Sequence, residues 1–330
     1  MPSDCFLLTG AAGYVGSHVL RLFLEQGQKC VVLDDLSKGH RLAVPSGVPF
    51  YQANISDENV LDEIFKAHTI AGVLHFAGFI EVGESMQNPA KYFENNLFAA
   101  IPLLEKVKTR KNCWIVFSSS AAVYGEPKQT PIHEHDPKNP NNPYGLTKWM
   151  FEEMLRAYDH SFGIRSISLR YFNAAGAHPA GDIGEDHAPE SHLIPLVCQT
   201  ALGKKDKIQI YGDDYPTQDG TCVRDYIHIL DLAKAHWIAA SSLQKGDPTK
   251  SYNLGNEKGY SVKEVIETVR RVTGKKINQE IAPRRKGDSA VLVASSKAFR
   301  EEHGWKPEFE TLEKIVESAW LWHHRHPDGF

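Results

Sequence analysis

The chain has 330 residues, which exceeds one usual compact domain and favours a large α/β domain with a smaller lobe. Its hydrophobic fraction of 42% and charged fraction of 24% are typical of a folded soluble protein, and its net charge of −4 gives no electrostatic reason to expect a nucleic-acid ligand. No apolar run is long enough to span a bilayer, and the N-terminus, MPSDCFLLTG, lacks the basic region of a signal peptide.

Cysteines and histidines indicate neither a disulfide framework nor a metal centre. The cysteines have no paired spacing, so we interpret them as reduced thiols and expect a cytoplasmic protein. Two histidine groups, HEH and HHRH, are accompanied by no cysteine or carboxylate set at ligand spacing. We interpret these groups as solvated surface side chains and expect no metal site. The residues concerned are Cys5, Cys30, Cys113, Cys198, Cys222, His133, His135, His323, His324 and His326.

The first half of the chain alternates apolar runs with helical patterns. Helices are predicted at 13–27, 57–68, 88–110 and 143–162. The alternation predicts a Rossmann-type, doubly wound parallel sheet with helices on both faces, in an α/β fold. The runs that predict buried strands lie at 5–9, 29–35, 48–54, 71–78, 112–120 and 164–173.

The pattern changes after about residue 175. The segment 175–195 is rich in glycine, proline, histidine and acidic residues and predicts a long loop, and further loops are predicted at 212–224 and 282–289. We therefore expect residues 1–175 to form a nucleotide-binding Rossmann domain. Residues 176–330 are expected to form mainly a smaller substrate-binding lobe, with some later segments returning to the first domain.

The first predicted strand runs into a glycine-rich turn, TGAAGYVGSH (9–18). Gly10, Gly13 and Gly16 permit a tight turn and close backbone approach, and the following helix start presents free N–H groups to a pyrophosphate. Asp34, at the end of the second strand, is placed to bind an adenosine ribose diol and would repel a 2′-phosphate, which favours NAD over NADP. The alternative is a tight strand–helix turn without a ligand.

A tyrosine and a lysine lie four residues apart in NNPYGLTK (141–148). On a helix, Tyr144 and Lys148 would share one face, and the proline before the tyrosine is favoured at a helix start. A second such pair, in YGEPK (124–128), has a proline inside the would-be helix and predicts a loop. Spacing alone does not separate an acid–base pair from a chance match, so the rest of the chain must decide.

Taken together, the glycine-rich turn, the serines at 118–120 and YGLTK resemble the extended short-chain dehydrogenase/reductase family. More specific blocks are similar to the UDP-glucose 4-epimerase (UDP-galactose 4-epimerase) family, and the resemblance extends from residue 5 to the C-terminus. It implies reversible C4 epimerisation of UDP-galactose and UDP-glucose through a 4-keto sugar, with tightly bound NAD. The blocks are HFAGFIEVGESMQNP (75–89), FSSSAAVYG (117–125), LRYFNAAGAHPAGDIGED (169–186), DDYPTQDGTCVRDYIH (213–228), YNLGN (252–256) and APRRKGD (282–288).

The resemblance implies a set of cofactor-binding residues. Asn54 stands where the family often has an aspartate beside the adenine, and Asn95 is expected to hold the neighbouring loops near the cofactor. Ile80 replaces the lysine that many members direct to the nicotinamide ribose, which implies looser retention of NAD. The implied set is Gly10, Gly13, Tyr14, Val15, Gly16, Asp34, Asp35, Leu36, Ser37, Asn54, Ile55, Phe76, Ala77, Gly78, Ile80, Asn95, Ser118, Tyr144, Lys148 and Phe172.

A second implied set would bind the UDP-sugar. Arg224 and Arg285 suit a diphosphate because a guanidinium is a planar, permanently charged fork, although surface ion pairs are the alternative. His192 replaces an asparagine of many members, which leaves its role open. Leu292 is intermediate in size at a position that gates the sugar pocket, so use of UDP-N-acetylhexosamines is an alternative hypothesis. The implied set is Ser120, Tyr144, Asn173, His192, Leu193, Gln209, Tyr211, Arg224, Arg285, Asp288 and Leu292.

Ser120, Tyr144 and Lys148 form the implied catalytic set. Inverting one hydroxyl requires oxidation to a ketone, rotation of the sugar and reduction from the other face, and so a base for the hydroxyl proton. Free tyrosine titrates near about pH 10, and a neighbouring ammonium together with a positive nicotinamide would lower that pKa. Ser120 would hydrogen-bond the sugar oxygen; alternatively it is a strand-end serine that bonds the backbone.

Other activities stay open at this point. A nucleotide-sugar 4,6-dehydratase would need acidic residues where the chain has Ala121 and Ala122, which disfavours it. A UDP-glucuronate epimerase would need a pocket for the C6 carboxylate, which the sequence does not localise. A catalytically silent NAD-binding regulator is the alternative of another class, and the intact serine, tyrosine and lysine argue against it.

We also expect a homodimer. The predicted helices at 88–110 and 143–162 carry apolar residues on more than one face, and members of the resembled family pair through these two helices. The alternative is that the apolar positions are ordinary core residues. The positions concerned are Leu97, Ile101, Leu104 and Met154.

Overall fold

The computed structural model describes residues 4–285 and 288–330, which fall into two compact units. The first unit contains the chain up to Gly125 together with Pro137–Arg170 and Ala233–Tyr252. The second unit contains Glu126–Asp136, Tyr171–Leu232 and Asn253–Phe330.

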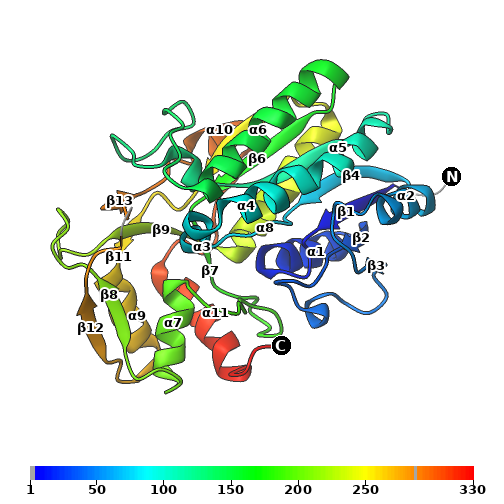
Figure 1. The fold of residues 1–330 in the computed structure, drawn as a ribbon. Coiled ribbons are helices and arrows are strands. Elements are labelled where there is room, and N and C mark those ends of the chain that lie inside the picture. The colour runs from blue at the N-terminus through cyan, green and yellow to red at the C-terminus, as the bar shows by residue number, and fades with distance from the viewer. Residues whose placement is uncertain (1–3, 286–287) are drawn as a thin grey trace. The chain divides into compact units, whose positions relative to one another are not determined.

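A seven-stranded sheet forms the centre of the first unit (Figure 1). Its strand order is β10-β6-β5-β4-β1-β2-β3, and β1 pairs in parallel with both β2 and β4. The order reverses between β1 and β4, and ligands of open α/β sheets bind beyond the carboxyl ends of the strands at such a point. The strands are β1 (Cys5–Thr9), β2 (Lys29–Leu33), β3 (Phe50–Tyr51), β4 (Ile70–His75), β5 (Trp114–Ser120), β6 (Ser166–Tyr171) and β10 (Lys250–Leu254).

Helices cover both faces of this sheet, because successive side chains of each strand point to opposite faces. Leu7 of β1 packs in a core with α2, α5 and α6, whereas Phe6 meets Phe23 of α1, whose ring in turn contacts Trp237 of α8. The helices are α1 (Tyr14–Glu25), α2 (Glu58–Ala67), α3 (Val82–Gln87), α4 (Pro89–Asn96), α5 (Ile101–Lys108), α6 (Pro143–Phe162) and α8 (Ile229–Lys245), with short 3₁₀ turns η1 (Arg41–Ala43), η2 (Phe98–Ala100) and η3 (Ala121–Tyr124).

The second unit carries two small sheets. The larger places β11, β9 and β13 side by side, with β7 also paired to β9, and the smaller joins β12 to β8. Helices α7, α9 and α11 share an apolar core with these strands. The elements are β7 (Asn173–Ala175), α7 (Leu193–Ala201), β8 (Ile208–Tyr211), β9 (Val223–His228), β11 (Gly259–Ser261), α9 (Val262–Thr273), β12 (Gln279–Ala282), β13 (Val291–Leu292), α10 (Lys297–His303) and α11 (Leu312–Arg325).

The α/β class and the parallel sheet predicted from the sequence are confirmed, with local corrections. The helix predicted over 88–110 is interrupted: α4 ends at Asn96, a 3₁₀ turn follows, and α5 starts with Pro102 in its first turn. Proline is accepted there because the first helical N–H groups need no intrahelical partner. The strand predicted at 48–54 shortens to Phe50–Tyr51.

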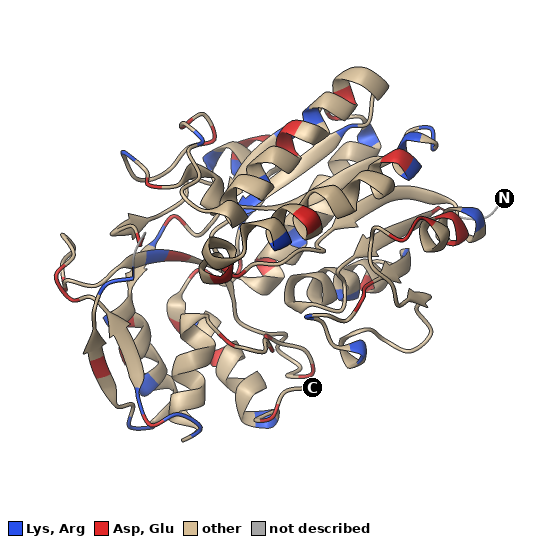
Figure 2. Ribbon diagram, viewed as in Figure 1, with Lys and Arg blue, Asp and Glu red and all other residues tan. Residues whose placement is uncertain are grey.

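Both signs of charge are interspersed over the helices and strands of each unit (Figure 2). None of the helices among the described residues is long and apolar enough to cross a membrane.

Candidate active site

The glycine-rich turn after β1 is closed by backbone packing. Gly10 has φ +73°, and a Cβ atom there would lie 2.4 Å from the Ala77 nitrogen. At Gly16 a Cβ would lie 2.5 Å from the Gly10 carbonyl oxygen. Gly13, the N-cap of α1, meets the Gly10 oxygen only at 3.4 Å, so packing does not demand a glycine there. Its missing side chain instead suits close approach of a ligand to the first N–H groups of α1.

Asp34 ties the end of β2 to this turn. Its Oδ2 accepts a hydrogen bond from the Ala12 N–H at 2.8 Å, and its Oδ1 accepts one from the Leu36 N–H at 2.8 Å. Burial raises the pKa of Asp34 above its ordinary value, and the two backbone donors partly offset that effect. The carboxylate is therefore oriented beside the turn, as a ribose diol would need.

The side chains of Asp35 and Asn54 are hydrogen-bonded to each other. Although burial raises the pKa of Asp35, hydrogen bonds from Ser37 and from Asn54 lower it below the ordinary value. The Asn54 Nδ2 donates to Asp35 at 3.0 Å, and its Oδ1 accepts from the Ser56 N–H and hydroxyl. Asn54 thus shapes this segment through its own side chain, next to the buried Ile55, and the adenine contact stays a prediction.

The loop after β4 is held by Asn96, not by the expected Asn95. The buried Asn96 side chain accepts a hydrogen bond from the Phe79 N–H at 2.8 Å and donates one to the Phe79 oxygen at 2.9 Å. Asn95 instead donates to Asn96 itself at 3.0 Å. Phe76, Ala77 and Gly78 precede this anchor, and the Ile80 side chain is exposed beyond it.

Tyr144 and Lys148 lie in the first turns of α6, which begins at Pro143. The Asn142 side chain caps the helix by accepting the Gly145 N–H at 2.8 Å. In the described structure the second tyrosine–lysine pair, at 124–128, lies outside any α-helix, as predicted. The sequence rule that separated the two pairs is therefore confirmed.

The Lys148 ammonium lies inside the first unit. Its Nζ donates to the Ser118 carbonyl oxygen at 2.9 Å and lies 4.9 Å from the centre of the Phe117 ring and 5.9 Å from that of Tyr144. Burial lowers the pKa of Lys148 to about 8, against the opposing pull of Glu152. A cation of this kind stabilises a phenolate nearby and can exchange a proton close to neutral pH.

Ser120 ends β5, the strand that carries Ser118. Its hydroxyl oxygen accepts a hydrogen bond from the Ala122 N–H at 3.1 Å, which starts the 3₁₀ turn η3. The backbone-bonding alternative for this serine is thus realised. A hydroxyl that accepts from the backbone still has its own hydrogen to donate, so a sugar contact stays a prediction.

A buried ion pair one turn further along α6 escaped the sequence analysis. Glu152 and Arg170 are each about 1% exposed, and their charged groups meet at 2.6 Å. Glu152 also accepts hydrogen bonds from Ser119 at 2.5 Å and from Ser251 at 2.9 Å. The pair therefore fixes α6 against β5, β6 and β10. A signal existed, because Glu152 follows Lys148 at the same four-residue spacing that joins Lys148 to Tyr144.

Two further buried histidines border this region. His75, at the end of β4, shares a hydrogen bond of 2.7 Å with the Thr9 hydroxyl. Burial, with the Lys148 charge as a second cause, lowers the pKa of His75 to about 3, so its ring is neutral. His236 of α8 is bonded at 3.1 Å to the hydroxyl of Ser118. Neither residue was expected from the sequence.

In the second unit, one group of the residues implied in UDP-sugar binding lies on or beside β9. Arg224 pairs in register with Leu292 of β13 and forms an ion pair of 3.5 Å with Asp288. It also donates to the Ser289 carbonyl oxygen at 2.8 Å. Asn173 of β7 donates to the Asp225 carbonyl oxygen at 2.9 Å. The structure thus brings four of the implied residues to one small sheet.

A second group lies on the sheet of β8 and β12. The Arg285 guanidinium lies over the Tyr211 ring, 3.8 Å from its centre. The Tyr211 hydroxyl donates to Gln209 at 2.8 Å, and both side chains project from the same face of β8. Phe172, expected beside the nicotinamide, also belongs to the second unit.

The side chain of His192 is engaged with acidic neighbours. Its Nδ1 lies 2.5 Å from a Glu185 oxygen, and Leu193 directly after it begins α7. Burial lowers the pKa of His192, but the Glu185 and Glu190 carboxylates outweigh it and raise that pKa. The sequence analysis missed the two glutamates because they lie in a loop without periodicity.

Known proteins resemble this chain over nearly its whole length. Residues 6–255 match the NAD dependent epimerase/dehydratase family. A UDP-glucose 4-epimerase of Halalkalibacterium halodurans is 53% identical over 98% of this chain and 97% of its own. A crystal structure of a UDP-glucose 4-epimerase matches with a TM-score of 0.97 and 46% identity, over 99% of each chain. The Bifidobacterium longum UDP-glucose 4-epimerase in complex with NAD⁺ and UDP matches with a TM-score of 0.93 and 37% identity, over 99% of this chain and 100% of that one.

Proposed function

Because the chain belongs to the NAD dependent epimerase/dehydratase family, we propose that it is an isomerase that interconverts UDP-galactose and UDP-glucose by epimerisation at C4, with NAD as its cofactor. The observation that carries the proposal is the pair formed by Tyr144 and the buried Lys148 at the start of α6. This pair provides a base and a tuned cation, which C4 oxidation requires and a silent regulator does not.

The residues around the glycine-rich turn fit a dinucleotide. Gly10 and Gly16 close the turn, Gly13 leaves the start of α1 approachable, and Asp34 is oriented for a ribose diol. NAD, when bound, supplies the hydride acceptor for the sugar C4. We propose the first unit as its binding domain.

The proton chemistry falls to the chain's own side chains. Tyr144, as a phenolate, accepts the proton of the C4 hydroxyl and later returns it, and Lys148 stabilises the phenolate before the first transfer and after the second. Ser120 donates a hydrogen bond to the same sugar oxygen. Turning the 4-keto sugar over exposes its other face to reduction, which inverts the carbon.

We propose the second unit as the UDP-sugar domain. Arg224 and Arg285 would bind the diphosphate, and Gln209, Tyr211 and Asn173 would line the nucleoside. Leu292 pairs in register with Arg224 and so lies on the same small sheet. The intermediate size of Leu292 is the ground for a second candidate, C4 epimerisation of UDP-N-acetylhexosamines. Turnover of UDP-N-acetylgalactosamine comparable to that of UDP-galactose would support it, and no detectable turnover would end it.

A cytoplasmic homodimer is the proposed working form. Leu97 and Leu104 belong to the core, as the alternative interpretation held, but large apolar side chains of the same region are exposed. They offer a face that a second copy would bury. Five buried free thiols suit a reducing compartment. The exposed apolar residues are Phe98, Ile101, Met150 and Phe162.

The test of the proposed function is an NMR assay of purified protein with UDP-galactose and no added nicotinamide. Formation of UDP-glucose would establish both the reaction and a retained cofactor. Rescue only by added NAD⁺ would indicate loose retention, as Ile80 predicts. Continued silence with NAD⁺ would refute this substrate assignment.

A further inference from the structure

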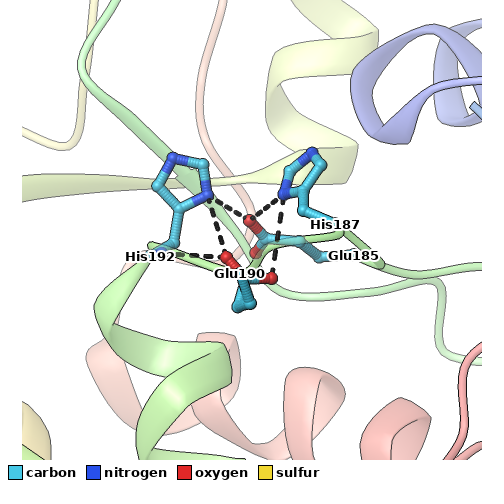
Figure 3. Close-up of side chains that lie close together, drawn as sticks. All are labelled: Glu185, His187, Glu190 and His192. Atoms are coloured by element: carbon cyan, nitrogen blue, oxygen red, sulfur yellow. Dashed lines mark hydrogen bonds and ion pairs between the residues drawn. The ribbon is translucent and has the colours of Figure 1, made fainter. Parts of the chain in front are cut away.

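Four side chains near the start of α7 form a cluster that takes no part in the proposed proton and hydride transfers. Glu185, His187, Glu190 and His192 each direct one potential ligand atom to a common point, and these atoms all lie within 4.8 Å of one another. In Figure 3 the Nδ1 edges of both imidazoles face the carboxylates, while the opposite ring edges point away.

The spacing of these atoms suits a tetrahedral metal ion. With metal–ligand distances of about 2.0–2.1 Å, neighbouring ligand atoms of a tetrahedral zinc site lie roughly 3.3–3.4 Å apart. His187 Nδ1 lies 3.3 Å from Glu185 Oε1 and 3.7 Å from Glu190 Oε2, and His192 Nδ1 lies 3.6 Å from the other Glu190 oxygen, Oε1. The remaining histidine–carboxylate distance, 2.5 Å between His192 Nδ1 and Glu185 Oε1, is a hydrogen bond that must lengthen by less than about 1 Å.

The charge and burial of the cluster favour a divalent cation. The side chains of Glu185 and Glu190 are only 4% and 5% exposed, and the charge that compensates them is that of the two imidazoles, whose protons a bound metal ion would replace. Two imidazoles and two carboxylates form a ligand set typical of zinc and its transition-metal neighbours, not of calcium or magnesium. The His192 side chain is 44% exposed, which gives an ion a path from solvent.

The surroundings hold the ligands in place. The Glu190 Oε1 accepts the backbone N–H groups of Ser191 and His192, each at 2.8 Å. The Glu185 carbonyl oxygen accepts the indole N–H of Trp322 at 3.0 Å. The first two bonds orient the Glu190 carboxylate itself, and the Trp322 bond fixes the backbone of Glu185.

We propose that Glu185, His187, Glu190 and His192 form a binding site for a single divalent transition-metal ion of the zinc class. The ion clamps the 185–190 segment to the first residue of α7. His192 binds it through Nδ1 and keeps Nε2 for other contacts. Leu193, implied in UDP binding, follows directly, so the ion would also steady this part of the nucleotide site.

Isothermal titration of the untagged full-length chain with ZnCl₂, after treatment with a chelator, tests the site. We expect one tightly bound ion per chain and a rise in melting temperature on binding. His187→Ala should weaken binding by more than about 100-fold, since even a second-shell partner is typically worth 10–100-fold. His135→Ala is the matched control, because it removes an exposed histidine that also lies beside an acid, Asp136, and it should leave binding unchanged.

Two further measurements distinguish loss of a metal ligand from misfolding of the His187→Ala variant. Glu190→Gln keeps the oxygen that accepts the backbone N–H groups and should weaken zinc binding in a folded chain. Cobalt(II) added to the chelated wild type should give the intense visible absorption of a tetrahedral site. Failure to bind a stoichiometric ion, or binding that survives both variants, would overturn the proposal and leave the cluster an ion-pair network only. Neither readout depends on epimerase activity.

Discussion

The two units hold their cationic groups in opposite ways. In the first unit the Lys148 ammonium is buried and bonded to a strand carbonyl, and burial brings its pKa down to about 8. In the second unit Arg285 is exposed and rests on an aromatic ring, while Arg224 is half-buried beside Asp288. We expect a group that tunes a proton transfer to be desolvated, and groups that attract a diphosphate to remain charged in contact with water.

The same difference is visible in the polar interactions around the buried cation of the first unit. Lys148 is followed one turn later by Glu152, which is bound to the buried Arg170 and to two serine hydroxyls. The proposed binding arginines of the second unit have simpler environments. We therefore expect mutations near Lys148 to affect chemistry and stability, and those near Arg285 to affect substrate affinity.

The largest expected effect is that of Tyr144→Phe. Removing the phenol hydroxyl removes the proposed acid–base group, so kcat should fall by roughly 10²–10⁴-fold, the usual worth of general acid–base catalysis. The melting temperature and bound NAD should be retained. Steady-state assays with UDP-galactose and release of NAD by denaturation measure these quantities, and near-normal turnover would refute the role of Tyr144.

Next in size is the effect of Glu152→Gln on stability. The change leaves the buried Arg170 charge uncompensated, which typically costs about 3–5 kcal/mol in free energy of unfolding. Urea unfolding measures it. The matched control is Glu153→Gln, whose partner Arg156 forms an exposed pair, and it should cost less than about 1 kcal/mol. Equal losses in the two variants would mean that the buried pair does not hold α6.

Arg285→Ala should act on affinity. Loss of a charged hydrogen-bond donor to the diphosphate, worth about 1.5–3 kcal/mol, should raise KM for UDP-galactose by roughly 10–100-fold with little change in kcat. Arg284→Ala is the control, because that neighbouring guanidinium is already bound to Asp214. A fall in kcat at unchanged KM would contradict the contrast between the two units.

The last prediction concerns the pH dependence of stability at Lys148. Its folded pKa of about 8 lies below the ordinary lysine value of 10.5, so between these values the unfolded chain binds more protons. The cost of the buried ammonium is fully present below about pH 8 and fades as the pH rises toward 10.5. Lys148→Met should abolish this rise in melting temperature. An unchanged pH profile in the variant would show that Lys148 is not desolvated.

Much of the first unit could be predicted because its elements are regular. Buried parallel strands appear as apolar runs, and Pro143 separated the helical tyrosine–lysine pair from the one in a loop. The role of Asn96 was not predicted, because adjacent helical residues point about 100° apart and only the packed structure shows which one meets Phe79.

Contacts between distant segments could not be predicted in this way. Arg170 lies within the strand predicted at 164–173, and its partner Glu152 lies 18 residues earlier. Likewise, the residues around His192 come from a loop whose path has no periodicity. In both places the pairing is decided by tertiary packing, which a single sequence does not display.

The most direct test of the account follows the hydrogen on C4. Purified protein would be given UDP-galactose carrying deuterium at C4 in ordinary water, and the UDP-glucose formed would be analysed by NMR. Because C4 is proposed to lose a hydride to NAD and recover the same one, the product should keep its deuterium at C4. Loss of the label to solvent would contradict the account, since it would mean that the carbon is inverted by proton exchange.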